Sequence, residues 1–418
     1  MSTILIKVKN LTHGSSYYSL SSLLPFPLMA KHYIFFTRNI LPQPAAHLIH
    51  DVNTANAAAN LGYSAILVYL HKKALNPLNW FAPFSPQQPP AELSRFYQIQ
   101  NKLKVFPLPL PWPINENQRK WLHTSTFICK YYFPCYIFPH SKIIHTLDWN
   151  LVKTAIRAGI PIIYEREHNQ YQKYDTEIVN SPLFQVAITV ADSVKENMIQ
   201  MGMPPAKIVK LHLSFNQAFL QRQAEKAATW RQKLLTNNRQ HLVVYAGGMY
   251  KFKGVNLLID VAKQLPQIQF AFAGGNESQL QAYRQLVQEK AIDNVIFLGY
   301  LSHADLPSLL QGADILAHPH LSGKAATFTS PLKFFEYLAS GTPIVATDIP
   351  PLREFQPIIA RWCQPDHPRE YAHCLQKVLT THPRKVEGYA AQINFARQFS
   401  WESRMAKIMS YVEPQIIN

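Results

Sequence analysis

Cysteine is scarce in this chain. Its 418 residues contain only four, Cys129, Cys135, Cys363 and Cys374. Their spacing matches no zinc-binding pattern, and so small a number is typical of reduced thiols in a cytosolic protein rather than of a disulfide framework. We therefore expect reduced thiols and no metal site.

Long apolar runs and internal repeats are also missing. No window reaches the roughly 18 apolar residues of a transmembrane helix, and no repeat of solenoid or propeller period is present. Residues 1–28 are rich in Ser, Leu and Tyr, but His13 and Gly14 break the uninterrupted apolar core that a secretory signal needs. We expect these residues to be a disordered extension, compatible with a true start at Met29.

Acidic residues are few: 25 against 41 Lys and Arg, a net charge of +16 that predicts an anionic partner. Between residues 95 and 142 seven basic residues face only one acid, Glu116, and many aromatics lie among them. Such a segment fits the surface of an anionic membrane, where each basic residue adds about 1 kcal/mol. The alternative is that half of the aromatics are core. Nucleic acid is not expected, because no zinc-finger spacing, RNP-like strand or basic repeat is present.

The most informative segment that is present is SPLKFFEYLASGTPIVATD, residues 330–348. Ser330 is a suitable N-cap, Pro331 suits the first helical position, and Gly341 can end the helix. The N-terminus of such a helix binds anions through its free N–H groups and its dipole. PIVATD then predicts a buried strand, so the unit is typical of a Rossmann-like half, although an ordinary capped helix has the same pattern.

A second segment, HLVVYAGGMYKFKG at residues 241–254, predicts a strand, a glycine turn and two lysines before an amphipathic helix. Gly247 and Gly248 would let the backbone approach a diphosphate, and Lys253 would supply compact positive charge. A solvated turn is the alternative. Alternating strand and helix patterns over the chain predict an α/β class with two or three domains.

In order, these segments resemble the retaining glycosyltransferases of family 4, also known as group 1, which have the GT-B fold of two Rossmann-like domains facing across a cleft. The resemblance covers the C-terminal half and rests on YAGGMYKFKGVNLLIDVA, FAFAGG, NVIFLGYL, ADILAHP, SPLKFFEYLASGTPIVATDIPPLRE and FSWESR.

The N-terminal half resembles the family more loosely. HYIFFTRNILPQPAAHLIH would be its first strand and substrate loop, with Ala45 and Ala46 in place of a glycine pair. The resemblance implies an extension at 1–28, an acceptor domain at 29–215, a nucleotide-sugar domain at 216–396, and a C-terminal helix at 397–418 that packs back toward the acceptor domain.

The resemblance also implies donor-site roles. Lys253 would neutralise the diphosphate beside the Gly247 and Gly248 turn, the backbone around Ser330, Pro331 and Leu332 would receive phosphate with help from Lys333, Glu336 would hold the ribose, and the backbone at Tyr300 would meet the base. Surface lysine and surface helix glutamate are the alternatives for Lys253 and Glu336. No metal is implied, because GT-B enzymes stabilise the leaving diphosphate with helix dipoles and basic side chains.

Two departures from the family concern catalysis. The first glutamate of the Glu-x7-Glu motif falls at Phe328, so its contact would come from Thr327, Thr329 or Lys324 or be absent. The second histidine of a His-x-His motif falls at Leu147. The remaining catalytic candidates are His145, Asp148 and His168, with Glu167 nearby, and each can equally be a structural residue.

These features predict a retaining hexosyltransferase that uses a nucleotide sugar, UDP-linked, and no other cofactor. The expected acceptor is a membrane glycolipid of the glycosyl-diacylglycerol type, as for a digalactosyldiacylglycerol synthase, with the protein peripheral on the cytosolic face of a membrane. Alternatives are a polysaccharide or cell-envelope transferase, a GT-B sugar-nucleotide epimerase, and a degenerate protein that only binds a sugar nucleotide.

Overall fold

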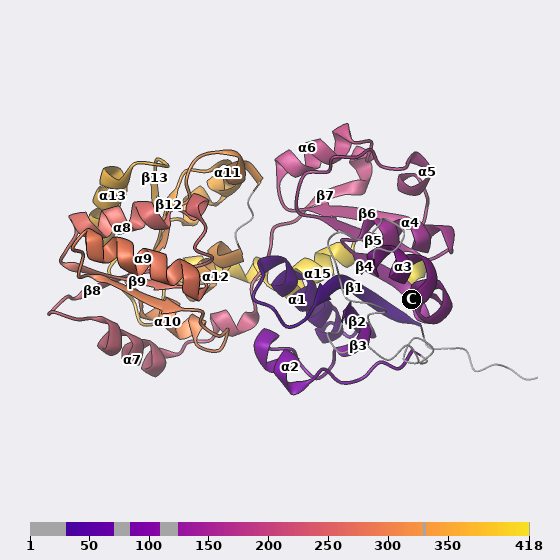
Figure 1. Ribbon diagram of the computed structural model, residues 1–418, viewed down its shortest axis with the longest axis horizontal. Helices are drawn as coiled ribbons and strands as arrows, with labels where there is room; N and C mark the ends of the chain where they lie inside the picture. Colours follow the sequence, from indigo (N-terminus) through magenta and orange to yellow (C-terminus); the bar gives the residue numbers. More distant parts are fainter. Residues whose placement is uncertain (1–30, 71–83, 109–123, 329–331, 418) are drawn as a thin grey trace, which may run out of the picture.

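The computed structural model describes residues 31–70, 84–108, 124–328 and 332–417, which form two α/β domains joined side by side (Figure 1). The predicted α/β class is therefore confirmed. The extension at 1–28 and the N-cap at Ser330 lie outside the described residues.

The N-terminal domain is built on a seven-stranded parallel sheet of order β3-β2-β1-β4-β5-β6-β7. Its inner strands are almost wholly apolar because helices cover both faces of a parallel sheet. The strands are β1 His32–Ile40, β2 Ala65–Leu70, β3 Lys104–Leu108, β4 Ser141–Thr146, β5 Ile162–Arg166, β6 Phe184–Thr189 and β7 Ile208–Lys210.

Helices connect these strands: α1 Ala46–Asn60, α2 Ala91–Tyr97, α3 Thr124–Phe127, α4 Trp149–Arg157, α5 Thr176–Val179 and α6 Asp192–Gln200. The basic and aromatic segment forms a π-helix, η3 Ile128–Ile137, which buries Tyr132 and Phe133 in the core. Lys130 and Tyr131 of the same turn are exposed. Part of the aromatic content is thus core and part is surface, while residues 109–123 are not described.

The C-terminal domain has a six-stranded parallel sheet of order β10-β9-β8-β11-β12-β13. The strands expected from HLVVYA and PIVATD are present as β8 and β12, and the family-like motifs FAFAGG, NVIFLGYL and ADILAHP contain β9, β10 and β11. The elements are β8 His241–Ala246, β9 Ile268–Ala273, β10 Val295–Gly299, β11 Ile315–His318, β12 Ile344–Thr347 and β13 Arg361–Cys363, with α7 Ala224–Leu234, η7 Lys251–Lys253, α8 Val255–Gln264, α9 Glu277–Glu289, α10 Leu306–Gly312, α11 Lys324–Phe328, α12 Leu332–Ser340, η8 Pro350–Ile358, α13 Pro368–Thr381 and α14 Ala390–Ala396.

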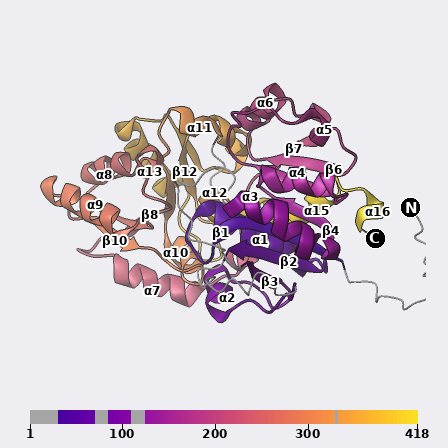
Figure 2. The same ribbon diagram turned by 45° about the vertical axis from the view of Figure 1, so that its right-hand side comes forward.

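The last long helix, α15 Trp401–Met409, returns to the N-terminal domain and lies beside α1 in both views (Figure 1, Figure 2); a short α16, Pro414–Ile417, follows. Ser400 caps α15 by accepting a hydrogen bond from the backbone of Ser403, as an N-cap serine does. Asn60 at the end of α1 donates to Glu402 over 2.9 Å. The domain boundaries at residues 215 and 396 stay predictions.

Candidate functional site

A cleft of about 750 Å³ lies between the two domains. The carboxyl ends of β8, β9, β10 and β11 form one wall, which is where parallel α/β sheets bind ligands. The first turn of α1 and the residues before it form the opposite wall. The lining includes Pro44, Ala45, Ala46, His47 and Ile49 on the N-terminal side, and Gly247, Gly248, Lys253, Gly274, Gly275, Tyr300, His303, His318, His320, Leu332 and Lys333 on the other.

Glycines make the floor of this cleft unusually close-packed. Gly274 has φ +121°, and a Cβ there would lie 2.1 Å from the carbonyl oxygen of Gly247. No side chain can be accommodated at that distance, so the turn after β9 needs glycine at position 274 for steric reasons. The N–H groups of Gly247 and Gly274 donate to the carbonyl oxygens of Ala273 and Gly299, and the approach of a diphosphate to the backbone at Gly247 and Gly248 stays a prediction.

Lys253 ends η7 and lines the cleft beside the glycine turn. Burial lowers the pKa of Lys253 to about 8. A desolvated ammonium group is a favourable place for an anion, because the negative charge of the anion would stabilise the charged form that burial disfavours. Lys251, two residues earlier, is exposed and does not line the cleft.

Helix α12 contributes Leu332 and Lys333 to the cleft wall. Lys333 forms an ion pair of 2.8 Å with Glu336, one helical turn later. Glu336 is only 1% exposed, so the alternative of an ordinary surface helix glutamate is wrong, while its contact to the donor ribose stays a prediction. Burial raises the pKa of Glu336, and Lys333 offsets part of that rise. Of this pair, Lys333 lines the cleft, whereas Glu336 is not among the lining residues.

Tyr300, after β10, lies at one end of the cleft and is 47% exposed. Its ring stacks on Phe96 of α2, with centroids 5.9 Å apart and planes 12° apart. A second cross-domain contact lies between α6 and α11, where the Ser193 hydroxyl donates to the Thr327 carbonyl oxygen over 3.0 Å. The two domains thus touch at both α2 and α6.

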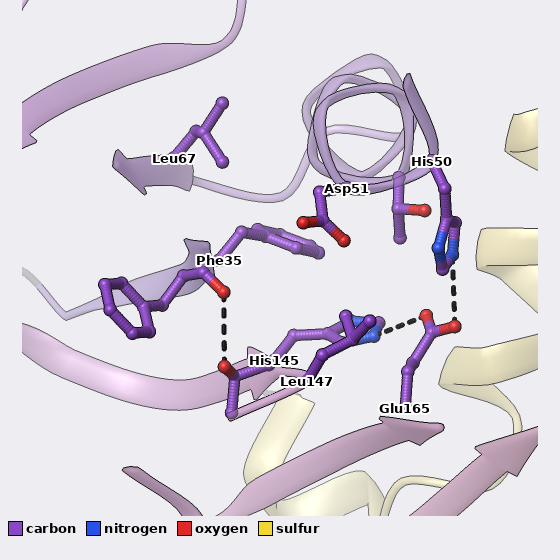
Figure 3. Close-up of a pocket in the computed structure, with 10 residues that line it drawn as sticks. Phe35, His50, Asp51, Leu67, His145, Leu147 and Glu165 are labelled. Carbon is purple, nitrogen blue, oxygen red and sulfur yellow. Dashed lines mark hydrogen bonds and ion pairs between the residues drawn. The ribbon is translucent and has the colours of Figure 1, made fainter. Parts of the chain in front are cut away.

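A buried polar cluster lies one turn further along α1, at the carboxyl ends of β4 and β5. Figure 3 shows His50 and His145 both pointing at Glu165, with Asp51 directed into a small cavity beside them. His145 donates to Glu165 over 2.7 Å and accepts from the Tyr33 hydroxyl over 2.9 Å. The cavity has room for about one water molecule, so it is too small for a sugar.

Charges in this cluster compensate one another. His50 forms ion pairs with Glu165 (3.1 Å) and Glu167 (2.8 Å). Arg404 of α15 donates to both carboxylate oxygens of Glu165, over 3.1 and 2.7 Å. Burial alone lowers the pKa of His50, but the two glutamates outweigh it and raise that pKa to about 10. Burial alone raises the pKa of Glu165, yet Arg404 and His50 hold it well below its usual range.

Asp51 is the acid that this cluster does not neutralise. Burial raises the pKa of Asp51 to about 7, although His50 offsets part of the effect. A buried acid with a pKa near neutrality beside a cavity is a feature shared by many functional sites and some structural ones.

The structure gives the three sequence-derived catalytic candidates different surroundings. His145 has both ring nitrogens in hydrogen bonds within the buried cluster. Asp148 caps α4 by accepting from the backbone of Asn150 and Leu151. His168 is exposed, and its carbonyl oxygen accepts from Arg166. Their catalytic roles remain untested predictions, and the contacts of His145 and Asp148 are those of structural residues.

Sequence reasoning missed His50, Asp51 and Arg404, and also the cleft residues His318 and His320. Arg404 belongs to the FSWESR motif, which marks the last helix but not its partner in the sheet. HPH at 318–320 begins at the end of the family-like motif ADILAHP, where β11 ends, and that position at the end of a parallel strand was the available signal.

Comparison with known proteins bears on this site. Residues 226–392 match the family model described as "Glycosyl transferases group 1". The matched stretch lies within the C-terminal domain. It contains the glycine turns, Lys253 and α12, so the family resemblance expected from the sequence is confirmed for this half.

Two curated relatives are glycosyltransferases by name. A stretch of 180 residues, 42% of this chain, is 25% identical to 44% of the putative teichuronic acid biosynthesis glycosyltransferase TuaH of Bacillus subtilis. Another of 129 residues, 30% of the chain, is 30% identical to 37% of the processive diacylglycerol alpha-glucosyltransferase of Acholeplasma laidlawii. The chain thus matches less than half the length of these relatives.

The fold is shared over nearly the whole molecule. The crystal structure of HepE from Anabaena in complex with UDP and glucose superposes with a TM-score of 0.63 at 14% identity, covering 91% of this chain and 98% of that one. The chain therefore has the GT-B fold, as its sequence predicts.

Proposed function

We propose that this protein is a retaining hexosyltransferase that takes its sugar from a UDP-linked donor bound in the interdomain cleft. The observation that carries this proposal is the combination of the glycine turns after β8 and β9 with Lys253 and Lys333 on the cleft wall formed by the C-terminal domain, which contains the stretch matching the group 1 family. No Asp or Glu is among the described residues that line the cleft, which favours an anionic ligand such as a diphosphate.

The chemistry assigned to the chain is electrostatic. Lys253 and the backbone amides near Gly247 would stabilise negative charge as the diphosphate leaves, as preorganised donors do in other transfer reactions. The departing diphosphate itself would accept the proton of the acceptor hydroxyl on the same face, so no separate base is needed. No cofactor beyond the donor is part of this proposal.

The acceptor we propose is a membrane glycolipid. Support comes from the diacylglycerol-directed relative and from the exposed Lys130 and Tyr131 of η3, on the domain that faces the donor. Among the described residues, no helix combines the length and apolarity that crossing a bilayer requires. Attachment would then be peripheral, at the cytosolic face of a membrane. TuaH favours the second candidate, a cell-envelope polysaccharide acceptor.

The deciding experiment incubates the purified protein with UDP-hexoses and follows UDP release, with and without vesicles that contain diacylglycerol glycolipids. Lipid-dependent UDP release is expected. Release with a soluble glycan alone would favour the second candidate, and failure of every UDP-hexose to bind would contradict the donor proposal.

A further inference from the structure

The order of the C-terminal sheet lines up four strand ends along the cleft. They follow one another as β10, β9, β8 and β11. Tyr300 follows β10, Gly274 follows β9, Gly247 follows β8, and His318 ends β11. Neighbouring strands are about 4.8 Å apart, so this row spans roughly 14 Å along the sheet edge.

A nucleotide sugar has its parts in a fixed linear order of base, ribose, diphosphate and hexose. If the base lies toward Tyr300, as the family resemblance implies, and the diphosphate at Gly247 and Lys253, as in the proposed function, the hexose reaches the end of β11. That position holds the segment His318, Pro319 and His320, which lines the cleft.

Both histidines are buried but incompletely hydrogen-bonded. His318 is 6% exposed and His320 is 1% exposed. Within the described part of the chain, Nδ1 of His318 and Nε2 of His320 have no hydrogen-bond partner. Their rings lie nearly parallel, 20° apart, with centroids separated by 5.8 Å. Leaving buried polar atoms unpaired costs stability, so two such atoms on a cleft wall indicate a ligand that pairs with them.

The protein holds this segment rigidly. The Thr347 hydroxyl donates to the carbonyl oxygen of His320 over 2.7 Å, and the backbone N–H of His318 donates to the Tyr371 hydroxyl over 3.0 Å. Gly254 packs so closely that a Cβ there would lie 1.7 Å from the carbonyl oxygen of Pro319. The histidine segment is therefore fixed against the turn that carries Lys253.

The two imidazoles are neutral in the free protein. Burial, together with the charge of Lys253, lowers the pKa of His320 to about 4. Burial also lowers the pKa of His318 well below its usual range, with smaller contributions from His320 and Lys253. A neutral imidazole has one donor and one acceptor nitrogen, which matches a hydroxyl group, itself a donor and an acceptor.

We propose that His318 and His320 bind hydroxyl groups of the transferred hexose, in place of the carboxylate that the sequence lacks at position 328. This inference rests on the proposed function, since it needs the diphosphate at Lys253. It assigns the two histidines to recognition of the sugar rather than of the nucleotide.

The test compares the Kd of UDP with the Kd of the tightest-binding UDP-hexose by calorimetry at pH 7.5. The variants are His318→Leu and His320→Leu, with His318→Asn and His320→Gln retaining a donor near each unpaired nitrogen. His303→Gln is the matched control, because His303 is also a buried cleft histidine but follows β10 at the other end of the row.

We expect each leucine variant to weaken UDP-hexose binding by about tenfold, the usual effect of one lost hydrogen bond of this kind, with UDP affinity within about twofold of wild type. The Asn and Gln variants recover part of the loss, and the His303 control leaves the ratio of the two constants unchanged. Equal weakening of UDP and UDP-hexose, or an unchanged ratio in both leucine variants, would overturn the assignment. Absence of UDP binding by the wild-type protein is a different result and would refute the proposed function itself.

Discussion

At the scale of single residues, Lys253 combines burial, cleft position and a lowered pKa. Losing a charge-assisted contact typically costs about 1.5–3 kcal/mol. We therefore expect Lys253→Ala to weaken UDP binding by about tenfold or more, measured by calorimetry, with an unchanged melting temperature. Lys251→Ala, in the same turn but exposed, is the control and is expected to bind UDP normally. Normal binding by the folded Lys253 variant would remove this residue from the donor site.

The pH dependence of UDP binding follows from the same lysine. Because burial lowers the pKa of Lys253 to about 8, the free protein loses this charge as the pH rises through 8. UDP affinity is expected to be highest below pH 8 and to fall above it, and Lys253→Ala is expected to abolish that fall. Titrations between pH 7 and 9.5 measure it, and a fall that persists in the variant would assign it to another group.

Asp51 gives a prediction about stability. Its pKa is raised from 3.8 to about 7, so its contribution to folding is complete below about pH 4 and is lost as the pH rises through 7. Asparagine cannot ionise. Asp51→Asn is thus expected to match wild type near pH 4 and to exceed its unfolding free energy by roughly 2–4 kcal/mol at pH 8. Urea denaturation at both values tests this, with the exposed Glu196→Gln as control. A variant that loses stability at pH 8 would show that ionised Asp51 is needed by the fold.

At the scale of elements, α15 is tied to the N-terminal sheet through one buried ion pair. Arg404 donates to both oxygens of Glu165 and to the carbonyl oxygen of His212. Breaking a buried pair from one side costs about 3–5 kcal/mol because a charge is left uncompensated. We therefore expect α15 to hold the two domains together.

Arg404→Met tests this role of α15 and is expected to lower the melting temperature strongly. Arg397→Met, exposed and just before α15, is the control and is expected to be neutral. Adding Glu165→Gln to Arg404→Met removes the orphaned charge and is expected to restore part of the loss. If Arg404→Met alone is as stable as wild type, the ion pair does not hold α15 in place.

At the scale of the whole molecule, the charge of +16 and the exposed Lys130 and Tyr131 favour a membrane-facing N-terminal domain. We expect the protein to sediment with anionic vesicles at low salt and to be released at high salt, because screening weakens such attraction. Changing Arg119, Lys120 and Lys130 together to glutamate is expected to abolish sedimentation; the first two lie outside the described residues. A wild-type protein that ignores anionic vesicles would favour the polysaccharide acceptor.

The sequence by itself determined the α/β class, two strands of the C-terminal sheet (β8 and β12) and the family resemblance of that domain. These depend on local features: apolar strand patterns, the glycine turn at Gly247 and the motif around α12, all readable without knowing what lies across the cleft. The tertiary structure alone decided which side chains meet. It buried Glu336 in an ion pair with Lys333, and it placed both ring nitrogens of His145 in hydrogen bonds. It also brought together His50, Glu165 and Arg404 from segments more than 100 residues apart. It also placed His318 and His320 at the end of the cleft row. Such contacts arise from strand order and from the return of α15, neither of which leaves a local pattern in the sequence.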